Sequence, residues 1–252
     1  MNPSLSIIYE NSDLLVVNKP AGLVCHPTKG DAYSSLIGRV RLHCDPLTDI
    51  HMINRLDRET SGIVLVAKNG ETAAKLRRLW ETRAVEKEYV AIVHGSPPNP
   101  GGVIDAPLGK DEESRVAIKD RVRADGAPAR TEFWVEQRIQ RQGEAFTQLR
   151  IVPRTGRKHQ IRIHLAYAGF PIVGDKLYGL DEDFYLALVE DRLTAENRQK
   201  LIVPFHALHA RKLQFSWEAG VMHFHAPSEA WFSKFAVEQA SIEPKMNLLR
   251  GQ

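Results

Sequence analysis

Residues 51–68 of the chain read HMINRLDRETSGIVLVAK, a polar cluster followed directly by an apolar run. The run from Gly62 to Lys68 is short and rich in Ile, Val and Leu, which predicts a buried β-strand. Such a strand would fix the loop before it, so that Asp57 becomes a carboxylate presented from a rigid backbone, as catalytic sites require. Asp, Thr, Ser and Gly so close together are also typical of an ordinary tight turn. On residue types alone, the turn is the favoured interpretation.

The segments on either side of this strand predict an α+β fold. Residues 5–10 and 14–18 form a predicted hairpin, and residues 96–128 are predicted to be loop with weak strands. Further strands are predicted at 87–94, 131–140, 145–152, 207–217 and 221–226, and helices at 32–43, 71–83, 158–168, 182–190 and 229–238. The strands at 131–140 and 145–152 are predicted to form a hairpin through residues 141–144, with Gly143 at its turn. Adjacent hairpins with irregularly interspersed helices favour a mixed, largely antiparallel central sheet flanked by helices and loops.

Composition limits the classes of protein that need to be considered. The chain has 252 residues and a formal net charge of +3, which permits a polyanionic partner without requiring one. Its two cysteines, Cys25 and Cys44, form no Cys-x-x-Cys pair, and the N-terminus lacks the features of a signal peptide. These features predict a reduced, cytoplasmic protein. No apolar run approaches the roughly 18–20 residues of a membrane-spanning helix, so membrane insertion is excluded.

Residues 150–164 carry the strongest local charge, with five basic residues, two histidines and no acid. Thr155 is predicted to cap the following helix, with Arg157 and Lys158 beside the free N–H groups as an anion site suited to phosphate. Arg162 lies next to the apolar stripe of this helix and is expected to point inward, where it needs a carboxylate partner. A solvated basic helix face is the competing interpretation.

Other polar residues give weaker signals. Tyr89 lies on a predicted strand, where an aromatic residue is more often part of the core than of a site. The pairs His206/His209 and His223/His225 do not have the spacing of a metal ligand set, so no metal is expected. The sequence also contains no glycine-rich nucleotide-binding motif and no Gly-x-Ser-x-Gly, which predicts no nucleotide cofactor and no serine hydrolase.

Several separated motifs of the sequence resemble those of one known protein family. Residues 55–62, RLDRETSG, resemble the signature of the RluA-like family of RNA pseudouridine synthases, in which the aspartate is essential. Further blocks match the family in the same order, at residues 9–22, 87–89, 155–165, 171–175 and 208–210. The resemblance covers about residues 7–216, and ordered motifs are far more specific than any one of them. It implies a single pseudouridine synthase-type catalytic domain over residues 1–252.

The chain departs from the family pattern in two respects. Asn54 stands where the family usually has histidine, which predicts altered local contacts rather than lost chemistry, since asparagine can also donate and accept hydrogen bonds. Many members carry a small S4-type RNA-binding domain ahead of the catalytic domain, and here the chain begins at the catalytic block. Target selection is therefore expected to come from the catalytic domain or from partners.

The resemblance implies a cofactor-free isomerisation of uridine to pseudouridine in RNA. Asp57 would be the catalytic carboxylate, by attack on C1′, attack on C6 or formation of a glycal, three routes that the sequence leaves open. The implied roles of the catalytic residues are pairing with Asp57 for Arg162, and pocket lining and assistance to the loss of the C5 proton for Tyr89. The implied binding roles are filling of the vacated base stack for Arg55 and phosphate binding for Arg157, Lys158 and His159.

The implied partner is ribosomal or transfer RNA, with the target uridine in a stem-loop or bulge, where removing a base from its stack costs least. The protein is expected to be monomeric. Two alternatives remain open at this point. One is a non-catalytic RNA-binding or RNA-folding protein with the same fold, and the other is a uracil-releasing glycosidase, which also uses a carboxylate near C1′.

Overall fold

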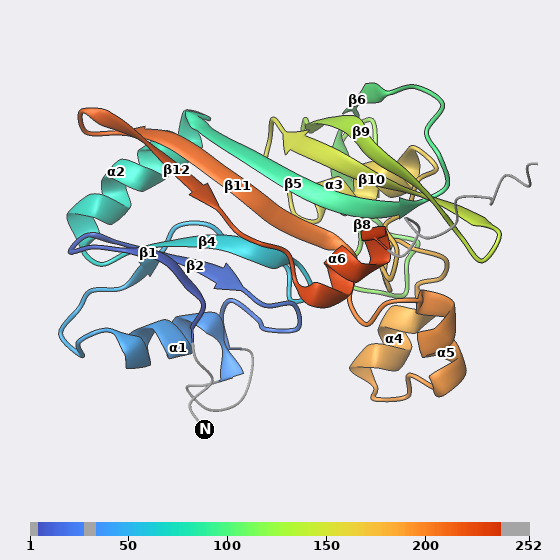
Figure 1. Cartoon of the computed structure of the whole chain (residues 1–252), viewed down its shortest axis with the longest axis horizontal. Coiled ribbons are helices and arrows are strands. Elements are labelled where there is room, and N and C mark those ends of the chain that lie inside the picture. Colours follow the sequence, from blue (N-terminus) through green and yellow to red (C-terminus); the bar gives the residue numbers. More distant parts are fainter. Residues whose placement is uncertain (1–4, 28–33, 238–252) are drawn as a thin grey trace, which may run out of the picture.

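The computed structural model describes residues 5–27 and 34–237, and its main feature is one long mixed β-sheet (Figure 1). Ten strands form this sheet in the order β1-β2-β4-β11-β5-β10-β9-β6, with β12 beside β11 and β3 beside β4, and β7 and β8 form a separate pair. The strands are β1 (Ile7–Glu10), β2 (Leu14–Lys19), β3 (His51–Met52), β4 (Ser61–Ala67), β5 (Val85–His94), β6 (Gly101–Asp105), β7 (Leu108–Lys110), β8 (Asp120–Val122), β9 (Arg130–Arg141), β10 (Glu144–Pro153), β11 (Leu208–Trp217) and β12 (Gly220–His225). The helices are α1 (Leu36–His43), α2 (Gly70–Glu81), α3 (Gln160–Tyr167), α4 (Asp183–Val189), α5 (Ala195–Leu201) and α6 (Ala230–Val237).

The sheet confirms the predicted α+β class and its largely antiparallel character. Among the strand pairs of the described residues, β4 with β11 is parallel and the others are antiparallel. The hairpin predicted around a glycine joins β9 to β10 through Gln142 and Gly143, whose φ angles are +52° and +85°. Positive φ at both positions is the geometry of a type I′ turn, one of the two common two-residue hairpin turns.

Some elements differ from the predictions. Helix α5 and the two-residue strand β3 were not predicted. For α5 the reason is that only Leu201 is buried, so the helix has no apolar stripe to detect. Helix α1 begins at Leu36, and residues 32 and 33 of the predicted helix lie outside the described residues, as does residue 238 of the last one. Within the described ranges, no helix combines the length and apolar character that crossing a bilayer demands.

Strand β4 lies at the centre of the N-terminal half of the sheet, and all seven of its residues are buried. Ile63 and Leu65 face the cluster that includes Leu76 of α2, whereas Val64 and Val66 face the cluster that includes Val40 of α1. Figure 1 shows α1 and α2 on opposite sides of β2 and β4. A strand that is covered on both faces has an uninterrupted apolar sequence, which explains the residues at 62–67.

The other half of the sheet is built on β5, β9 and β10, and helices α3 and α6 pack against it. Ile161 and Leu165 of α3 belong to the same apolar cluster as Phe232 and Phe235 of α6. Strand β11 joins the two halves, because it pairs with β4 on one side and with β5 on the other. The loop before β4 and the start of α3 therefore meet at the middle of the sheet.

Gly62 lies where strand β4 packs closely against strand β11. It has φ +112° and pairs with Ala210 of β11, and a Cβ atom on it would lie 2.3 Å from the Ala210 carbonyl oxygen. Only glycine fits here, because both the backbone conformation and the available space exclude a side chain.

We expect Gly62→Ala to destabilise the fold by about 3 kcal/mol or more, since backbone strain and overpacking each cost about 1–3 kcal/mol. Gly143→Ala is the matched control, with a similarly positive φ but nothing within 4 Å of the added Cβ atom. It should lose only about 1 kcal/mol from strain. Equilibrium urea unfolding of both variants measures the difference, and equal losses would show that the contact with Ala210 carries no cost.

Candidate active site

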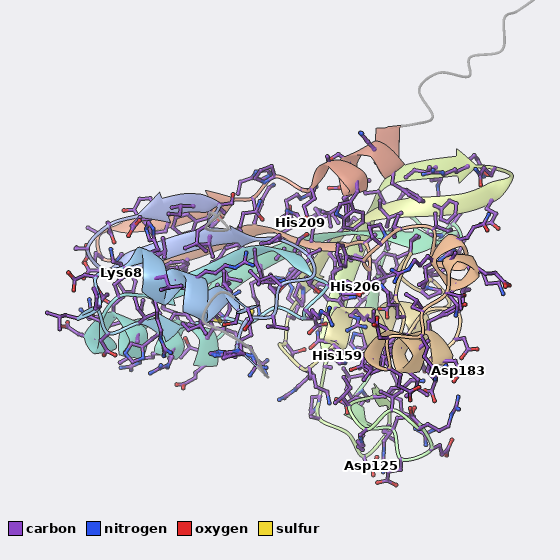
Figure 2. The ribbon with its side chains drawn as sticks, turned by 90° about the horizontal axis from the view of Figure 1, so that it is seen from below. Lys68, Asp125, His159, Asp183, His206 and His209 are labelled. Carbon is purple, nitrogen blue, oxygen red and sulfur yellow. The ribbon has the colours of Figure 1, made fainter. Side chains whose placement is uncertain are left out.

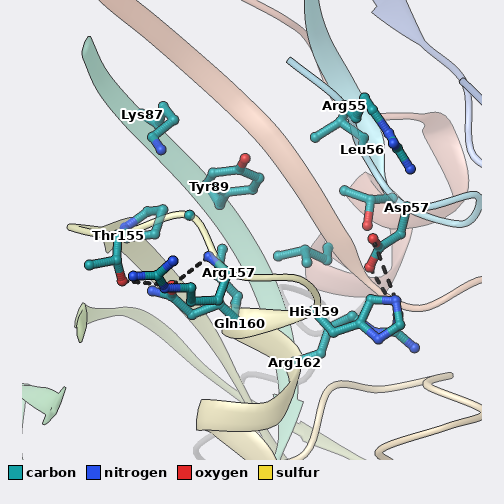
Figure 3. A pocket seen from close by; sticks show the side chains of 15 residues that line it. Arg55, Leu56, Asp57, Lys87, Tyr89, Thr155, Arg157, His159, Gln160 and Arg162 are labelled. Atoms are coloured by element: carbon teal, nitrogen blue, oxygen red, sulfur yellow. Dashed lines mark hydrogen bonds and ion pairs between the residues drawn. The ribbon is translucent and has the colours of Figure 1, made fainter. Parts of the chain in front are cut away.

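A pocket of about 490 Å³ lies where the loop before β4, strand β5 and the start of α3 meet (Figure 3). Figure 3 shows Arg55 and Asp57 on one side of this pocket and Lys87, Tyr89 and Thr155 on the other. The lining residues are Arg55, Leu56, Asp57, Thr60, Lys87, Tyr89, Pro153, Thr155, Gly156, Arg157, His159, Gln160, Ile161, Arg162 and Leu208. The pocket thus contains six of the seven predicted catalytic and binding residues, drawn from separate segments, and Lys158 is the one that does not line it.

Arg162 binds two carboxylates, one of which faces the pocket. Its Nη1 donates to Asp57 Oδ2 at 2.9 Å, while its Nε and Nη2 donate to the two carboxylate oxygens of Asp175 at 2.7 and 2.8 Å. The prediction that Arg162 points inward to a carboxylate is confirmed, and it has two such partners. Burial alone would lower the pKa of Arg162, but the two carboxylates raise it above its usual value, so the guanidinium stays charged.

Asp57 is held as a carboxylate inside a partly closed site. Its side chain is 29% exposed, and burial by itself raises the pKa of Asp57. The positive charge and hydrogen bond of Arg162 act in the opposite direction and bring the pKa of Asp57 below its ordinary value of 3.8. At neutral pH the site therefore presents an ionised carboxylate that remains partly open to a ligand.

Asp175 fixes the direction of the Arg162 side chain. Its Oδ1 accepts hydrogen bonds from the backbone N–H groups of Leu177 and Tyr178, both at 2.9 Å, and its side chain is fully buried. Burial opposes the charge, but Arg162 and these N–H groups hold the pKa of Asp175 far below the usual range. The sequence motif at residues 171–175 contained this residue, but no sequence pattern assigned it the pairing role.

His159 approaches Asp57 from the other side, with Nε2 3.8 Å from Asp57 Oδ1. Its Nδ1 lies 2.9 Å from the Tyr178 hydroxyl, which already accepts a hydrogen bond from the Asp120 N–H. The Tyr178 hydroxyl can donate a hydrogen bond to Nδ1, and a neutral imidazole in that tautomer carries its proton on Nε2, facing Asp57. Burial lowers the pKa of His159, which favours this neutral form.

The predicted helix cap at Thr155 is wrong. Helix α3 begins at Gln160 and its N-cap is His159, with φ +55° and no side-chain cap. The Thr155 hydroxyl instead donates to Gln160 Oε1 at 2.7 Å and accepts from the Arg130 N–H at 2.9 Å. Gln160 Oε1 also accepts from the Arg157 N–H, so this side chain has taken the place that a capping threonine would occupy.

The remaining predicted binding residues lie at different depths. Arg55 is exposed at the pocket edge, and Arg157 lines the pocket while its Nε donates to the Pro128 carbonyl at 3.1 Å. Lys158 lies outside the lining residues, and its ammonium is 2.8 Å from Asp120.

Tyr89 lines the pocket and also packs against the core, and burial together with the charge of Asp57 raises the pKa of Tyr89 to about 12.

Lys19 supports the loop that carries Asp57. This lysine is fully buried, and its Nζ donates to the carbonyl groups of Pro20, Leu23 and Arg58 at 2.8–3.1 Å. Burial lowers the pKa of Lys19 to about 8. The lysine thus ties the turn after β2 to the residue next to Asp57. Its position at the end of strand β2, after Asn18, gave no sign of this role.

Two buried histidines hold the other end of the loop. His206 Nε2 lies 2.7 Å from the Thr60 hydroxyl, and His209 Nδ1 lies 2.8 Å from the Ser61 hydroxyl while its Nε2 contacts the Ala226 carbonyl at 3.0 Å. Figure 2 shows both histidines inside the molecule. Among the residues that the structure describes, no three His, Cys, Asp or Glu side chains are grouped to hold a metal.

Asn54, the departure from the family pattern, also contributes to the loop. Its Nδ2 donates to the Ile63 carbonyl at 3.1 Å and its Oδ1 accepts from the Leu65 N–H at 2.7 Å. The side chain therefore bonds to the edge of β4 as a further strand would, and so it fixes the start of the loop.

Comparison with known proteins assigns the chain to a family. The family model for RNA pseudouridylate synthase matches residues 13–167, more than half of the chain. The chain belongs to this family. The matched segment of this pseudouridylate synthase family member includes Asp57, Tyr89 and Arg162.

Individual relatives agree with this assignment. The chain is 40% identical over 181 residues to an uncharacterized RNA pseudouridine synthase, YlyB, of Bacillus subtilis, covering 69% of this chain and 58% of that protein. It is 34% identical over 220 residues to the ribosomal large subunit pseudouridine synthase D of Pseudomonas aeruginosa, covering 85% of this chain and 65% of that protein. The chain thus spans about three fifths of the length of these pseudouridine synthases.

A solved structure extends the similarity to the fold. Human RNA pseudouridylate synthase domain containing 1 superimposes with a TM-score of 0.72 at 25% identity, over 90% of this chain and 85% of that one. The mixed sheet described above is therefore the fold of pseudouridylate synthase domains.

We expect Asp175→Asn to destabilise the protein by about 3 kcal/mol or more, because removing one partner of a buried ion pair typically costs about 3–5 kcal/mol. Asp125→Asn is the control, since Asp125 pairs with Arg123 at the periphery of the molecule (Figure 2) with its side chain 69% exposed. The control should leave the unfolding midpoint unchanged. Thermal and urea unfolding measure both variants, and a stable Asp175→Asn protein would contradict the anchoring role.

Proposed function

We propose that this chain is an RNA pseudouridine synthase that isomerises uridine to pseudouridine, with Asp57 as its catalytic carboxylate. The observation that carries the proposal is the pairing of Asp57 with Arg162 at 2.9 Å inside the pocket, which keeps a partly exposed carboxylate ionised. Membership of the pseudouridylate synthase family supports the same activity.

The chemistry needs little more than such a carboxylate. The C1′–N1 bond of uridine breaks, a C1′–C5 bond forms, C5 loses a proton and N1 regains one, so there is no net oxidation and no group is lost. Asp57 takes part through C1′, through C6 or through the 2′ proton, and each route begins with the ionised form. The proposed reaction therefore uses no metal and no nucleotide cofactor.

Tyr89 is proposed to position the uracil ring. With a pKa raised to about 12, its phenol stays protonated at neutral pH and is a poor proton acceptor. A neutral ring that lines the pocket can stack against the base and donate a hydrogen bond from its hydroxyl. This geometry supports orientation of the base after its glycosidic bond has broken.

The pocket also suits a polyanion. Besides Arg162, its lining includes the cations Arg55, Lys87 and Arg157, whereas Asp57 is the one carboxylate among the lining residues. Excess positive charge around a deep site favours RNA phosphates. The target uridine must leave its stack to reach Asp57, at a cost of a few kcal/mol that loops and bulges reduce.

Large-subunit ribosomal RNA is the substrate that we propose to test first, with transfer RNA as the alternative. The support is the name of the Pseudomonas aeruginosa relative, a ribosomal large subunit pseudouridine synthase. On the same basis we propose that the enzyme works in the cytoplasm, where bacterial ribosomes are assembled. A monomeric state remains a prediction.

Deletion of the gene is expected to remove pseudouridine from one or a few positions of cellular RNA. Wild-type protein should restore these positions and Asp57→Asn should not, because asparagine cannot supply an ionised carboxylate. Carbodiimide modification followed by primer extension on total RNA makes the measurement. Restoration by Asp57→Asn would favour the RNA-binding protein without catalysis, and free uracil released in amounts equal to the uridine consumed would favour the glycosidase.

Loss of Arg162 is expected to move the acid side of the activity profile to higher pH. In the wild type the pKa of Asp57 lies below 3.8, so activity should not fall between pH 8 and pH 5 through protonation of this group. In Arg162→Met only burial and weaker charges act on Asp57. Because burial raises the pKa of Asp57, activity should fall as the pH is lowered towards 5.

Arg162→Lys retains a charge and is the matched control for this profile. Single-turnover rates from pH 5 to 9 on a large-subunit RNA transcript, with pseudouridine measured by mass spectrometry, compare the three proteins. If Arg162→Met had a lower plateau but the wild-type pH profile, control of Asp57 ionisation by Arg162 would be ruled out.

A further inference from the structure

Lys87 is a charged residue inside the pocket that has no partner among the residues that the structure describes. It is half-buried, and no hydrogen bond or ion pair joins its Nζ to another described residue. The basic residues next to the pocket differ in this respect, since Arg154 pairs with Glu132 at 2.6 Å and Lys158 with Asp120 at 2.8 Å. Burial lowers the pKa of Lys87, and no carboxylate is close enough to oppose the effect. An ammonium in this situation gains from any anion that reaches it.

The position of Lys87 separates it from the reacting carboxylate. Lys87 and Tyr89 are two residues apart on β5, so their side chains lie on the same face of the sheet. The charge of Asp57 contributes to the raised pKa of Tyr89 but not to the pKa of Lys87. Along the pocket the order is therefore Asp57, Tyr89 and Lys87, with Lys87 at the end farthest from the carboxylate, as Figure 3 also shows.

Gly156 keeps the space in front of this ammonium open. A Cβ atom added to Gly156 would meet Lys87 Nζ at 3.8 Å and no other atom within 4 Å. Arg157 follows directly and also lines the pocket. An anion can approach here between an ammonium, a bare stretch of backbone and a guanidinium, which is an arrangement that suits phosphate.

We propose that Lys87 binds a phosphodiester group next to the target uridine, at the end of the pocket opposite Asp57. The inference rests on the proposed function, in which the uracil lies between Asp57 and Tyr89. Asp57 is already paired with Arg162 and does not need Lys87, whereas an RNA strand entering the pocket brings its own anions. The role is substrate binding, and it is distinct from stabilising the catalytic carboxylate.

The salt dependence of RNA binding tests this assignment. The probe is a fluorescein-labelled 12-nucleotide oligouridylate, titrated by fluorescence anisotropy in 50–300 mM KCl with proteins that also carry Asp57→Asn, so that no turnover occurs. Each phosphate neutralised on a single strand contributes about 0.7 to the slope of log affinity against log salt. Lys87→Met should reduce the slope by about 0.7 and weaken binding at the lowest salt about tenfold.

Three further variants serve as controls. Lys87→Arg keeps the charge and should keep the slope. Lys212→Met removes a lysine on the neighbouring strand β11 whose ammonium lies 3.3 Å from Glu88, and it should also keep the slope. Lys87→Gln is a second neutral variant, which should match Lys87→Met and replaces it if the methionine variant unfolds on heating earlier than wild type. An unchanged slope in the neutral variants would overturn the assignment.

Steady-state kinetics on a large-subunit RNA transcript separate binding from a structural effect through Tyr89. Lys87→Met without the Asp57 change should raise KM about tenfold and leave kcat within about twofold, because a contact made equally before and during reaction affects only KM. A fall in kcat at constant KM would contradict phosphate binding. If wild type produced no pseudouridine in any cellular RNA, the proposed function would fail, whereas an unchanged slope with active wild type would reject only the role of Lys87.

Discussion

The ion triad of Asp57, Arg162 and Asp175 is the interaction on which the site depends. It connects three segments far apart in the sequence, namely the loop before β4, helix α3 and the turn after residue 174, through hydrogen bonds of 2.7–2.9 Å. The exposed fraction of the side chains increases along the triad, from 0% for Asp175 through 8% for Arg162 to 29% for Asp57. Charge is thus compensated in the interior, and the incompletely shielded carboxylate is the one that faces the pocket.

Buried polar groups hold the loop of Asp57 from several sides. Lys19 bonds to three carbonyl groups, and the hydroxyls of Thr60 and Ser61 contact His206 and His209. Each bond constrains the backbone rather than the reacting side chain. A site prepared in this way need not reorganise during reaction. In the proposed function, most of the motion therefore falls on the RNA, whose base must swing into a fixed pocket.

The sequence predicted the elements with strong local signals and part of the site. The apolar run of β4, the glycine turn between β9 and β10 and the inward direction of Arg162 followed from periodicity and turn chemistry. The cap at Thr155 was predicted wrongly because the side chain of Gln160 took over its role. Lys19, Asp175 and the open ammonium of Lys87 depend on contacts between distant segments, and no spacing along the chain encodes them.

The parallel pairing of β4 with β11 also has a consequence for the order in which the protein matures. Ser61 and His209 are 148 residues apart, yet their contact helps to fix the loop of Asp57. Loops of this length close slowly, and β11 is synthesised long after β4. A nascent chain therefore carries an incomplete catalytic loop until β11 has left the ribosome and docked. The loop of Asp57 is thus completed well after its own residues have been made, and a truncation before residue 208 leaves it without this support.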